Sequence, residues 1–370
     1  MASNAQLEAA ILANPDDKSA YSVYADWLQS QGDPRGDLIA LSLAGDDAAA
    51  GGLMIKKGSA LLGPLVDHQR SYDDENTENF TWRWGFIDRA RLSFDENMSN
   101  KRVDLKQVLS DLLDHPSGHL VRELVFGING ESGDTSLDNL IEVLAAKPRP
   151  SLRRLIFGDV KYAGAAREQD QGEETEISWY NVGDLSKLWA QVPNLESVII
   201  TCGGDATLGE LDLPKLRHFE FRSGSFKKSN LASVIASHTP NLEHLDVWIG
   251  QESYGSDIVA DDLRPLIHRK DLPKLKHLGI MNCEVIEELI PDLRKSELVA
   301  KLDELDLSLG CLSDEGAAAI KEDPGAMGTL AKLDVSYSLL TEAGMLKGVA
   351  KQVVEIEQRD PDDRYAAVGE

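Results

Sequence analysis

The chain has 370 residues, of which 42% are hydrophobic and 27% charged, with 63 acidic against 38 basic side chains. The net charge of −25 repels a phosphate backbone, which argues against nucleic acid as a partner and favours a basic protein. No apolar run approaches the roughly 18 residues of a membrane helix, and the first residues lack a secretory signal, so we expect a cytoplasmic protein. Cys202, Cys283 and Cys311 form no CxxC pair, and we expect reduced thiols.

Residues 1–44 predict a small helical module of helix, turn, helix, turn and helix, in which Gly32-Asp33-Pro34 ends the second helix. We expect its core to contain Tyr24, Trp27, Leu28 and Leu38. A charge network that fixes the turn is expected from Asp26, Arg35 and Asp37. Residues 45–85 are predicted to be a partly mobile linker and an N-terminal cap, in which WRWGFI (82–87) leads into the first strand.

Residues 86–356 contain a repeated apolar pattern, Leu-x-x-Leu-x-Leu with conservative replacements. Successive copies start 21 to 43 residues apart, which leaves room for a strand, a turn and a helix in each repeat. The nine predicted strand cores begin at Ile87, Val121, Leu152, Leu195, Leu216, Leu242, Leu275, Leu302 and Leu330. Helices are predicted between them at 137–146, 184–192, 230–238, 285–295 and 313–322, and proline turns precede four of the strands.

Strand, helix, strand in series implies parallel strands, and their alternating pattern leaves one face of the sheet open. This chain resembles the leucine-rich repeat proteins of the ribonuclease-inhibitor-like class over residues 86–356, with Asn129 and Cys283 at the usual Asn/Cys position. The pattern YADWLxxxGDPRGxLIxL (24–41) resembles the repeat-companion domain of some bacterial leucine-rich repeat families. The resemblance implies an α/β solenoid, a horseshoe with a parallel sheet of about nine strands, helices on the convex face, and a small all-α module.

Two further segments interrupt or end the repeats. Residues 161–176 are polar and acidic without periodicity, which predicts a loop insertion at one rim of the solenoid. Residues 357–370 are predicted to be an acidic C-terminal tail or cap, because the end of a repeat array needs a polar cover.

Aligned strand positions should stack about 4.8 Å apart on the open face. Strand positions are counted from the first leucine of the Leu-x-x-Leu-x-Leu pattern, so Leu242 is first and Asp246 is fifth. In the first half of the repeats the fifth position is apolar, and we expect an apolar stripe of Val125, Ile156 and Ile199, with Ile128 nearby. Either another segment of the chain or a partner should cover this stripe. The second half carries a histidine ladder beside carboxylates, and the expected partner-binding patch is His218, Glu220, Arg222, His244, Asp246, Trp248, His277, Met281, Asp306 and Asp334. An exposed tryptophan flanked by ionic groups is typical of a binding hot spot.

No phosphate-binding loop, dinucleotide motif, HExxH, GxSxG or CxxC is present, so we expect no catalysis, no cofactor and no metal site. The histidine ladder is interpreted as a by-product of repeat duplication. The predicted function is a non-enzymatic scaffold that binds a protein on its concave face. The alternative is a regulator of an enzyme, such as an inhibitor or a GTPase activator, for which Arg89 or Arg91 would have to serve as the positioned arginine. Oligomeric state and the role of the helical module stay open.

Overall fold

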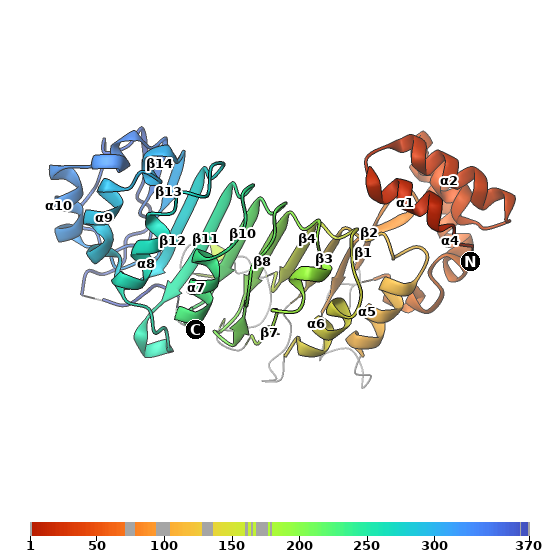
Figure 1. Cartoon of the computed structure of the whole chain (residues 1–370), viewed down its shortest axis with the longest axis horizontal. Helices are drawn as coiled ribbons and strands as arrows, with labels where there is room; N and C mark the ends of the chain where they lie inside the picture. Colours follow the sequence, from red (N-terminus) through yellow and green to blue (C-terminus); the bar gives the residue numbers. More distant parts are fainter. Residues whose placement is uncertain are drawn as a thin grey trace.

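The structure is a computed structural model, and it describes residues 2–70, 78–93, 104–127, 136–159, 162–163, 166–167, 177, 180–362 and 364–368. Ile128, Asn129 and most of the 161–176 insertion lie outside the described residues. The strands stack along the long axis of the molecule, with the N-terminal helices at one end and α10 at the other (Figure 1).

Four helices and a 3₁₀ turn open the chain: α1 (Ala5–Ala13), α2 (Lys18–Ser30), α3 (Arg35–Ala44), α4 (Asp47–Leu62) and η1 (Gly63–His68). Tyr24, Leu28 and Leu38 are buried as predicted, and Trp27 is half-buried. The predicted linker is wrong over α4, because Asp46 accepts a hydrogen bond from the backbone of Ala49 and caps a regular helix there.

The predicted charge network at the α2–α3 turn is confirmed for Arg35 and wrong for Asp26 and Asp37. Arg35 is fully buried and pairs with Asp33 at 2.9 Å, while Asp26 is exposed and Asp37 accepts a hydrogen bond from Gln29. The Arg35 guanidinium also donates to the carbonyl of Pro116 at 2.9 Å. This buried pair therefore ties the helical module to the repeat region.

One sheet of 11 strands runs through the rest of the described chain. All nine predicted strands are present, and β1 at one edge and β15 at the other are additional. The strands in spatial order are β1 (Phe80–Arg83), β2 (Phe86–Leu92), β3 (Glu123–Phe126), β4 (Arg154–Phe157), β8 (Ser197–Thr201), β10 (His218–Arg222), β11 (His244–Gly250), β12 (His277–Cys283), β13 (Glu304–Asp306), β14 (Lys332–Asp334) and β15 (Gln352–Val354).

Within this sheet, β2 and every later strand pair in parallel, and β1 pairs with β2 as an antiparallel hairpin. Trp84 and Gly85 form the hairpin turn, both with positive φ, as a tight hairpin requires. The register is the one that the repeat alignment predicts: His218 pairs with His244, and His244 pairs with His277. The ladder positions on the sheet are therefore confirmed.

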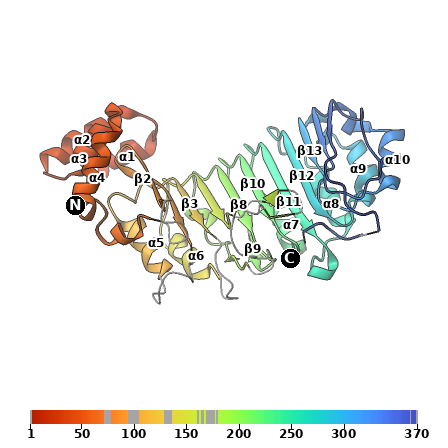
Figure 2. The same cartoon turned by 180° about the vertical axis from the view of Figure 1, so that it is seen from behind.

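Helices cover one face of this sheet: α5 (Leu105–Asp114), α6 (Asp138–Ala145), α7 (Lys228–Ile235), α8 (Ala260–Ile267), α9 (Ile290–Lys295) and α10 (Asp314–Glu322) (Figures 1 and 2). The main core fills the space between the helices and the sheet in one continuous apolar cluster that runs from Leu62 to Leu346. We call the opposite side the helix-free face; it carries the third, fifth and seventh positions of the repeats.

The helix predicted over 184–192 is wrong, since only the 3₁₀ turn η4 (Trp189–Gln191) forms there. The two-residue strand β7 (Gly183–Asp184) pairs with β9 (Ala206–Thr207) of the next repeat instead, and the Trp189 indole donates to the carbonyl of Leu208 at 2.6 Å. The backbone N–H groups that a helix would use are engaged here in pairing between repeats. A short antiparallel pair, β5 (Tyr162–Ala163) with β6 (Ala166–Arg167), lies in the insertion.

Candidate functional site

The helix-free face carries a ladder of three histidines on adjacent strands. The rings of His218 and His244 stack with centroids 4.3 Å apart, and those of His244 and His277 stack at 3.9 Å with an angle of 5° between their planes. Parallel strands in register place equivalent side chains one strand spacing apart, which brings the rings into contact. The sequence predicted this ladder correctly.

Asp246 lies at the centre of the ladder and is almost fully buried, at 7% exposure. His244 Nε2 and His277 Nε2 each donate to one of its two carboxylate oxygens at 2.7 Å. Burial alone would raise the pKa of Asp246, but the hydrogen bonds from both histidines outweigh it and hold that pKa well below its ordinary value. The group is therefore an ionised carboxylate bridging two imidazoles.

His277 is the most buried of the three histidines and faces carboxylates on both sides. Its Nε2 contacts Asp246, and its Nδ1 lies 3.4 Å from Glu304 Oε2 on β13. Burial disfavours the charged ring, yet the hydrogen bond to Asp246 and the attraction of the surrounding carboxylates raise the pKa of His277 to about 9. Glu304 is held in turn by the ammonium group of Lys332 on β14.

Gly279 provides the space that the Asp246 carboxylate occupies. It is the fifth-position residue of β12, next to Asp246 in the register. A Cβ atom at Gly279 would come within 2.1 Å of Asp246 Oδ1 and within 3.2 Å of the Met281 sulfur. In the sequence, the break that this glycine makes between Asp246 and Asp306 at the fifth position is the signal that could have identified the space.

Glu220 forms a second buried cluster on β10, at the other end of the ladder. It accepts a hydrogen bond from Arg222 Nε at 2.6 Å and lies 3.5 Å from His218 Nε2. Burial acts to raise the pKa of Glu220, but His218 and Arg222 together lower it below the ordinary value. Arg222 is therefore engaged inside the chain.

Asp306 and Asp334 occupy the fifth position of β13 and β14 and pair in register. Burial first, and then the charge of Asp334, raise the pKa of Asp306 to about 7. Each carboxylate also accepts a backbone hydrogen bond from two residues further on, at Ser308 and Ser336. Because like charges repel, ionisation of both neighbouring carboxylates costs free energy.

The prediction that Trp248 is exposed is wrong. Its exposure is only 4%, and it packs in an apolar cluster with Ile177, Leu309 and Val368, against which Met281 is partly buried. Ile177 directly follows the 161–176 insertion, and Val368 belongs to the C-terminal tail. Two distant segments therefore cover the tryptophan, and neither carries a sequence signal of its destination. Met281 likewise contacts the chain's own side chains instead of lying free.

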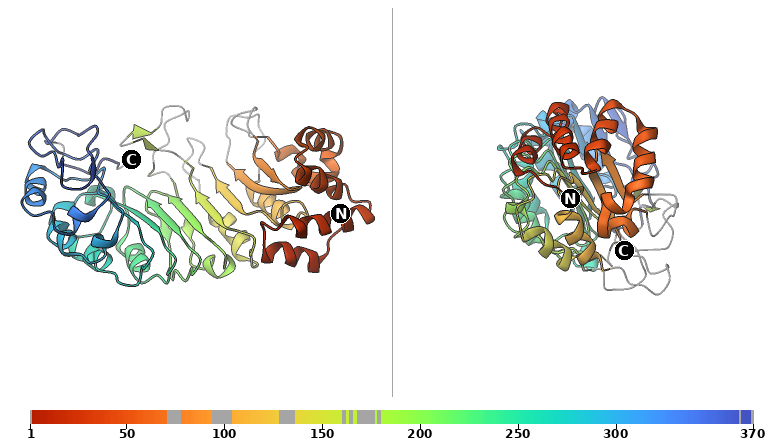
Figure 3. Two further views of the ribbon diagram at one scale, coloured as in Figure 1. Left: turned by 90° about the horizontal axis from the view of Figure 1, so that it is seen from above. Right: turned by 90° about the vertical axis from the view of Figure 1, so that its right-hand side faces the viewer.

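Asn282 holds the tail on the helix-free face. Its side chain donates to the carbonyl of Val368 at 2.6 Å and accepts from the Val368 N–H at 2.8 Å. Gln251 accepts from the backbone of Ala366, and the Ala367 N–H donates to the carbonyl of Leu309. Figure 3 shows the C-terminal end lying on the side of the sheet away from the helices. The predicted tail is therefore packed across the face.

The predicted apolar stripe is buried within the chain. Val125 has no exposed surface, Ile156 and Ile199 are each 9% exposed, and the three form a cluster of their own. The alternative of a partner that covers an exposed stripe is therefore wrong for these three residues. The prediction for Ile128 falls outside the described residues.

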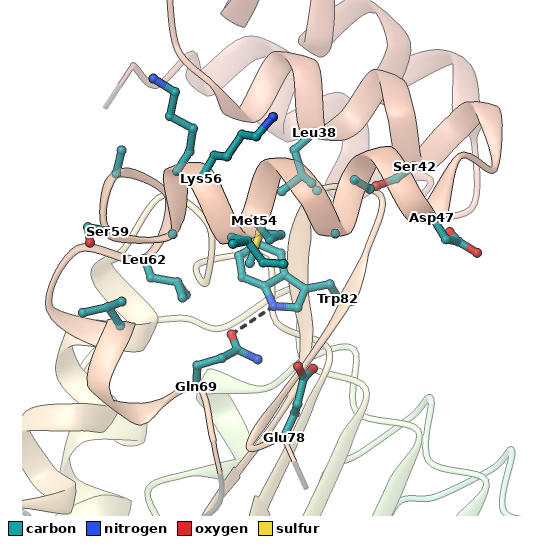
Figure 4. A pocket seen from close by; sticks show the side chains of 18 of the residues that line it. Leu38, Ser42, Asp47, Met54, Lys56, Ser59, Leu62, Gln69, Glu78 and Trp82 are labelled. Atoms are coloured by element: carbon teal, nitrogen blue, oxygen red, sulfur yellow. Dashed lines mark hydrogen bonds between the residues drawn. The ribbon is translucent and has the colours of Figure 1, made fainter. Parts of the chain in front are cut away.

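A groove of about 1000 Å³, not predicted from the sequence, lies between α4 and the β1–β2 hairpin. Met54, Leu62 and Trp82 line it, and the Trp82 indole donates to Gln69 Oε1 at 3.2 Å (Figure 4). Ile55, on the same helix, is 89% exposed. The signal that could have found the groove is the apolar LMI triplet (53–55) in a stretch interpreted as linker.

All three cysteines are buried and free, as expected for small apolar fillers. Burial raises the pKa of the Cys202 and Cys283 thiols to about 12. Thiols of this kind are protonated and unreactive at neutral pH.

The comparisons with known proteins bear on the fold alone. No family model matches the chain, and no curated protein sequence matches it. A structure of a Bacteroides fragilis protein, solved by a structural genomics consortium, is 22% identical over 86% of this chain and 85% of that one, with a TM-score of 0.61. An internalin from Listeria monocytogenes is 15% identical over 74% of this chain and 88% of that one, with a TM-score of 0.26, too low to carry an argument.

The class of protein follows from the architecture. The chain is a mixed α/β protein with one large, mostly parallel sheet and helices on one side of it, compatible with a solenoid. Across the part of the chain that the structure describes, every helix is too short or too polar to cross a bilayer.

Proposed function

We propose that this chain is a leucine-rich repeat protein that acts as a non-enzymatic scaffold and binds a basic protein on its helix-free face. The observation that carries the proposal is the group of carboxylates on that face, with Glu220, Asp246, Asp306 and Asp334 at the fifth strand position and Glu304 at the third. Arg222 at the seventh position and Lys332 at the third lie beside them, and each is paired with one of these carboxylates, Glu220 and Glu304 respectively. The net charge of −25 of the whole chain adds a negative field that steers a cationic partner toward the protein.

The proposed contact area differs from the patch expected from the sequence, because Trp248 lies under the tail. The third-position row at the start of the strands is partly accessible and carries both signs of charge: Glu123 and Glu304 show 24% and 28% of their side chains, beside Arg154 with 45% and His218 and Lys332 with about a third each. A polar row of this kind supports a salt-sensitive interface with fast association rather than an aromatic hot spot.

The domain division proposed with this function is a repeat-companion module over 1–44, a cap over 45–85, repeats over 86–356 and a tail over 357–370. The bacterial cytoplasmic location proposed with it is supported by the three buried cysteines without a disulfide.

Regulation of an enzyme is the second candidate function. A GTPase activator would need an arginine free to enter another active site. Arg89 Nε is paired with Glu123 at 3.1 Å, and Arg91 Nε is paired with Asp159 at 2.6 Å. These pairs favour inhibition by steric cover over activation by an arginine finger.

The test is affinity capture from a bacterial lysate with matched charge-reversal variants at low and moderate salt. Glu304→Lys with Asp334→Lys changes the helix-free face, whereas Asp114→Lys with Glu142→Lys makes the same charge change on exposed positions of α5 and α6. We expect the first pair alone to lose a salt-sensitive protein. Equal capture by both pairs, with folding verified by circular dichroism, would rule out binding on this face.

A further inference from the structure

His244, Asp246 and His277 converge in a way that the proposed partner binding does not use. One nitrogen of each imidazole and one oxygen of the carboxylate all lie within 4.8 Å of one another. Within the described ranges, no other group of three histidine, cysteine, aspartate or glutamate residues converges like this. We propose that these three side chains bind one divalent transition metal ion of the zinc type. This inference goes beyond the proposed scaffold function and does not rest on it.

The donor set suits the proposed ion. Two imidazole nitrogens and one carboxylate oxygen are ligands that zinc and the neighbouring imidazole-preferring metals accept, and three protein ligands leave a coordination position for water or another group. Both Nε2 atoms already point at the Asp246 carboxylate, each at 2.7 Å. A cation between these atoms would replace the protons that the two rings now donate.

The geometry of the imidazole rings determines which of them must rotate when a metal ion binds. His244 and His277 are nearly parallel, so their in-plane lone pairs run side by side instead of meeting at one point. Rotation about χ2 tilts an imidazole easily, because this torsion has a broad energy minimum. His244 is exposed over 30% of its side chain and His277 over 14%, so His244 is the ring with more room to move. Because the His244 ring is stacked between those of His218 and His277, its tilt requires His218 to shift with it.

Glu304 orients His277 for this role. Its carboxylate faces Nδ1 of the ring at 3.4 Å, which leaves Nε2 to face Asp246. Metal-binding histidines commonly donate their other ring N–H to a carboxylate, which fixes the ring and increases its basicity as a ligand. Lys332 on the next strand holds Glu304 in turn. The support behind His277 therefore extends over three adjacent strands.

Gly279 is a second observation that supports the site, because it leaves room for the Asp246 carboxylate between the two rings. A Cβ atom there would lie 2.1 Å from Asp246 Oδ1, so any side chain would displace the carboxylate from between the two rings. The other residues of the fifth position in this half of the sheet all carry side chains. The single break in the row falls where the three donor groups meet.

The test uses the full chain, freed of affinity tag and of metal by chelation, and titrated with Zn²⁺ in a calorimeter and with Co²⁺ in a spectrophotometer. We expect one equivalent to bind and Co²⁺ to show the absorption of a four- or five-coordinate N/O site. Asp246→Asn and His277→Ala should each weaken Zn²⁺ binding at least about 100-fold, and Glu304→Gln about 10-fold. Gly279→Ala should weaken it as well.

His238→Ala is the matched control. His238 Nδ1 contacts Asp212 at 2.8 Å, and both side chains are 68% exposed, so this pair offers the same two groups without a third ligand. We expect unchanged affinity. Metal-free variants are first compared by thermal unfolding, and Asp246→Asn, which preserves shape, stands in if His277→Ala does not fold. Absence of stoichiometric uptake by the wild type, an Asp246→Asn variant that binds as tightly, or an equal loss in His238→Ala would overturn the proposal.

Discussion

The two halves of the helix-free face both bury the fifth strand position, one with apolar and the other with charged side chains. At the fifth strand position, β3, β4 and β8 carry Val125, Ile156 and Ile199, which bury against one another. Across the boundary, Glu220 and Asp246 occupy the same position and are equally buried. The apolar half gains from removal of hydrocarbon from water, whereas the polar half depends on complete pairing of its charges. The second half should therefore be sensitive to pH and ligands, and the first should not.

The largest effect is expected from loss of the central carboxylate. Asp246→Ala leaves His244 and His277 without their shared acceptor, and we expect about 3 to 5 kcal/mol of destabilisation. The depressed pKa of Asp246 gives stability that is present above its ordinary value of 3.8 and lost as the pH falls toward its folded value. The raised pKa of His277 gives stability that is full below 6.5 and lost as the pH rises through about 9.

The cost of Asp246→Ala should accordingly be greatest between these limits, near about pH 5 to 6, and smaller near about pH 10. Urea unfolding of wild type and variant at both pH values measures it. A cost that is the same at both pH values would contradict the charged network.

The apolar half should respond with a cost that does not depend on pH. Ile199→Ala removes buried methyl groups and leaves a cavity, for which we expect about 2 to 4 kcal/mol. The same urea series measures this cost, with Ile55→Ala as control because that side chain is exposed on α4. If the cost of Ile199→Ala varied with pH as that of Asp246→Ala does, the contrast between the two halves would be lost.

The tail contact gives a smaller and more local effect. Val368→Asp places a charge in the cluster with Trp248 and Leu309, and we expect the tail to leave the face at a cost of about 1 to 3 kcal/mol. The fluorescence of Trp248 should shift to the red as water reaches the indole. Comparison with Trp248→Phe isolates this signal from the other five tryptophans of the chain. An unchanged spectrum in Val368→Asp would show that the tail does not cover Trp248.

The smallest effect is expected at Asp306, in the carboxylate row. Substitution there should stabilise the folded protein, unlike the substitutions above. The raised pKa of Asp306 means that the carboxyl is held protonated, so its contribution to stability falls as the pH rises from 3.8 through about 7. Asp306→Asn keeps the acceptor for Ser308 and removes the charge, so we expect a gain of about 1 kcal/mol near about pH 8 and a smaller gain near about pH 5. Thermal unfolding at the two pH values tests it, and a loss at both would show that the charge of Asp306 is stabilising.

Much of the site was predictable because it depends on register. The repeated leucines fix which strand residues face the core, and alignment of the repeats places His218, His244 and His277 beside one another, as observed. The same alignment could not show that Asp246 bridges two of these rings. That contact depends on side-chain rotamers and on the space above Gly279, which the pattern of apolar residues does not encode.

The sequence by itself determined nine of the strands of the sheet, their parallel order and their register, since a period of two in apolar residues admits only one face toward a core. Only the tertiary structure decided which parts of the helix-free face stay accessible. The tail reaches Gln251 across 115 residues of chain and Asn282 across 86, and it buries Trp248 on the way. Contacts of that separation are set by where the ends of the folded chain lie in space, so a local pattern around Trp248 could predict an outward-facing side chain but not its cover.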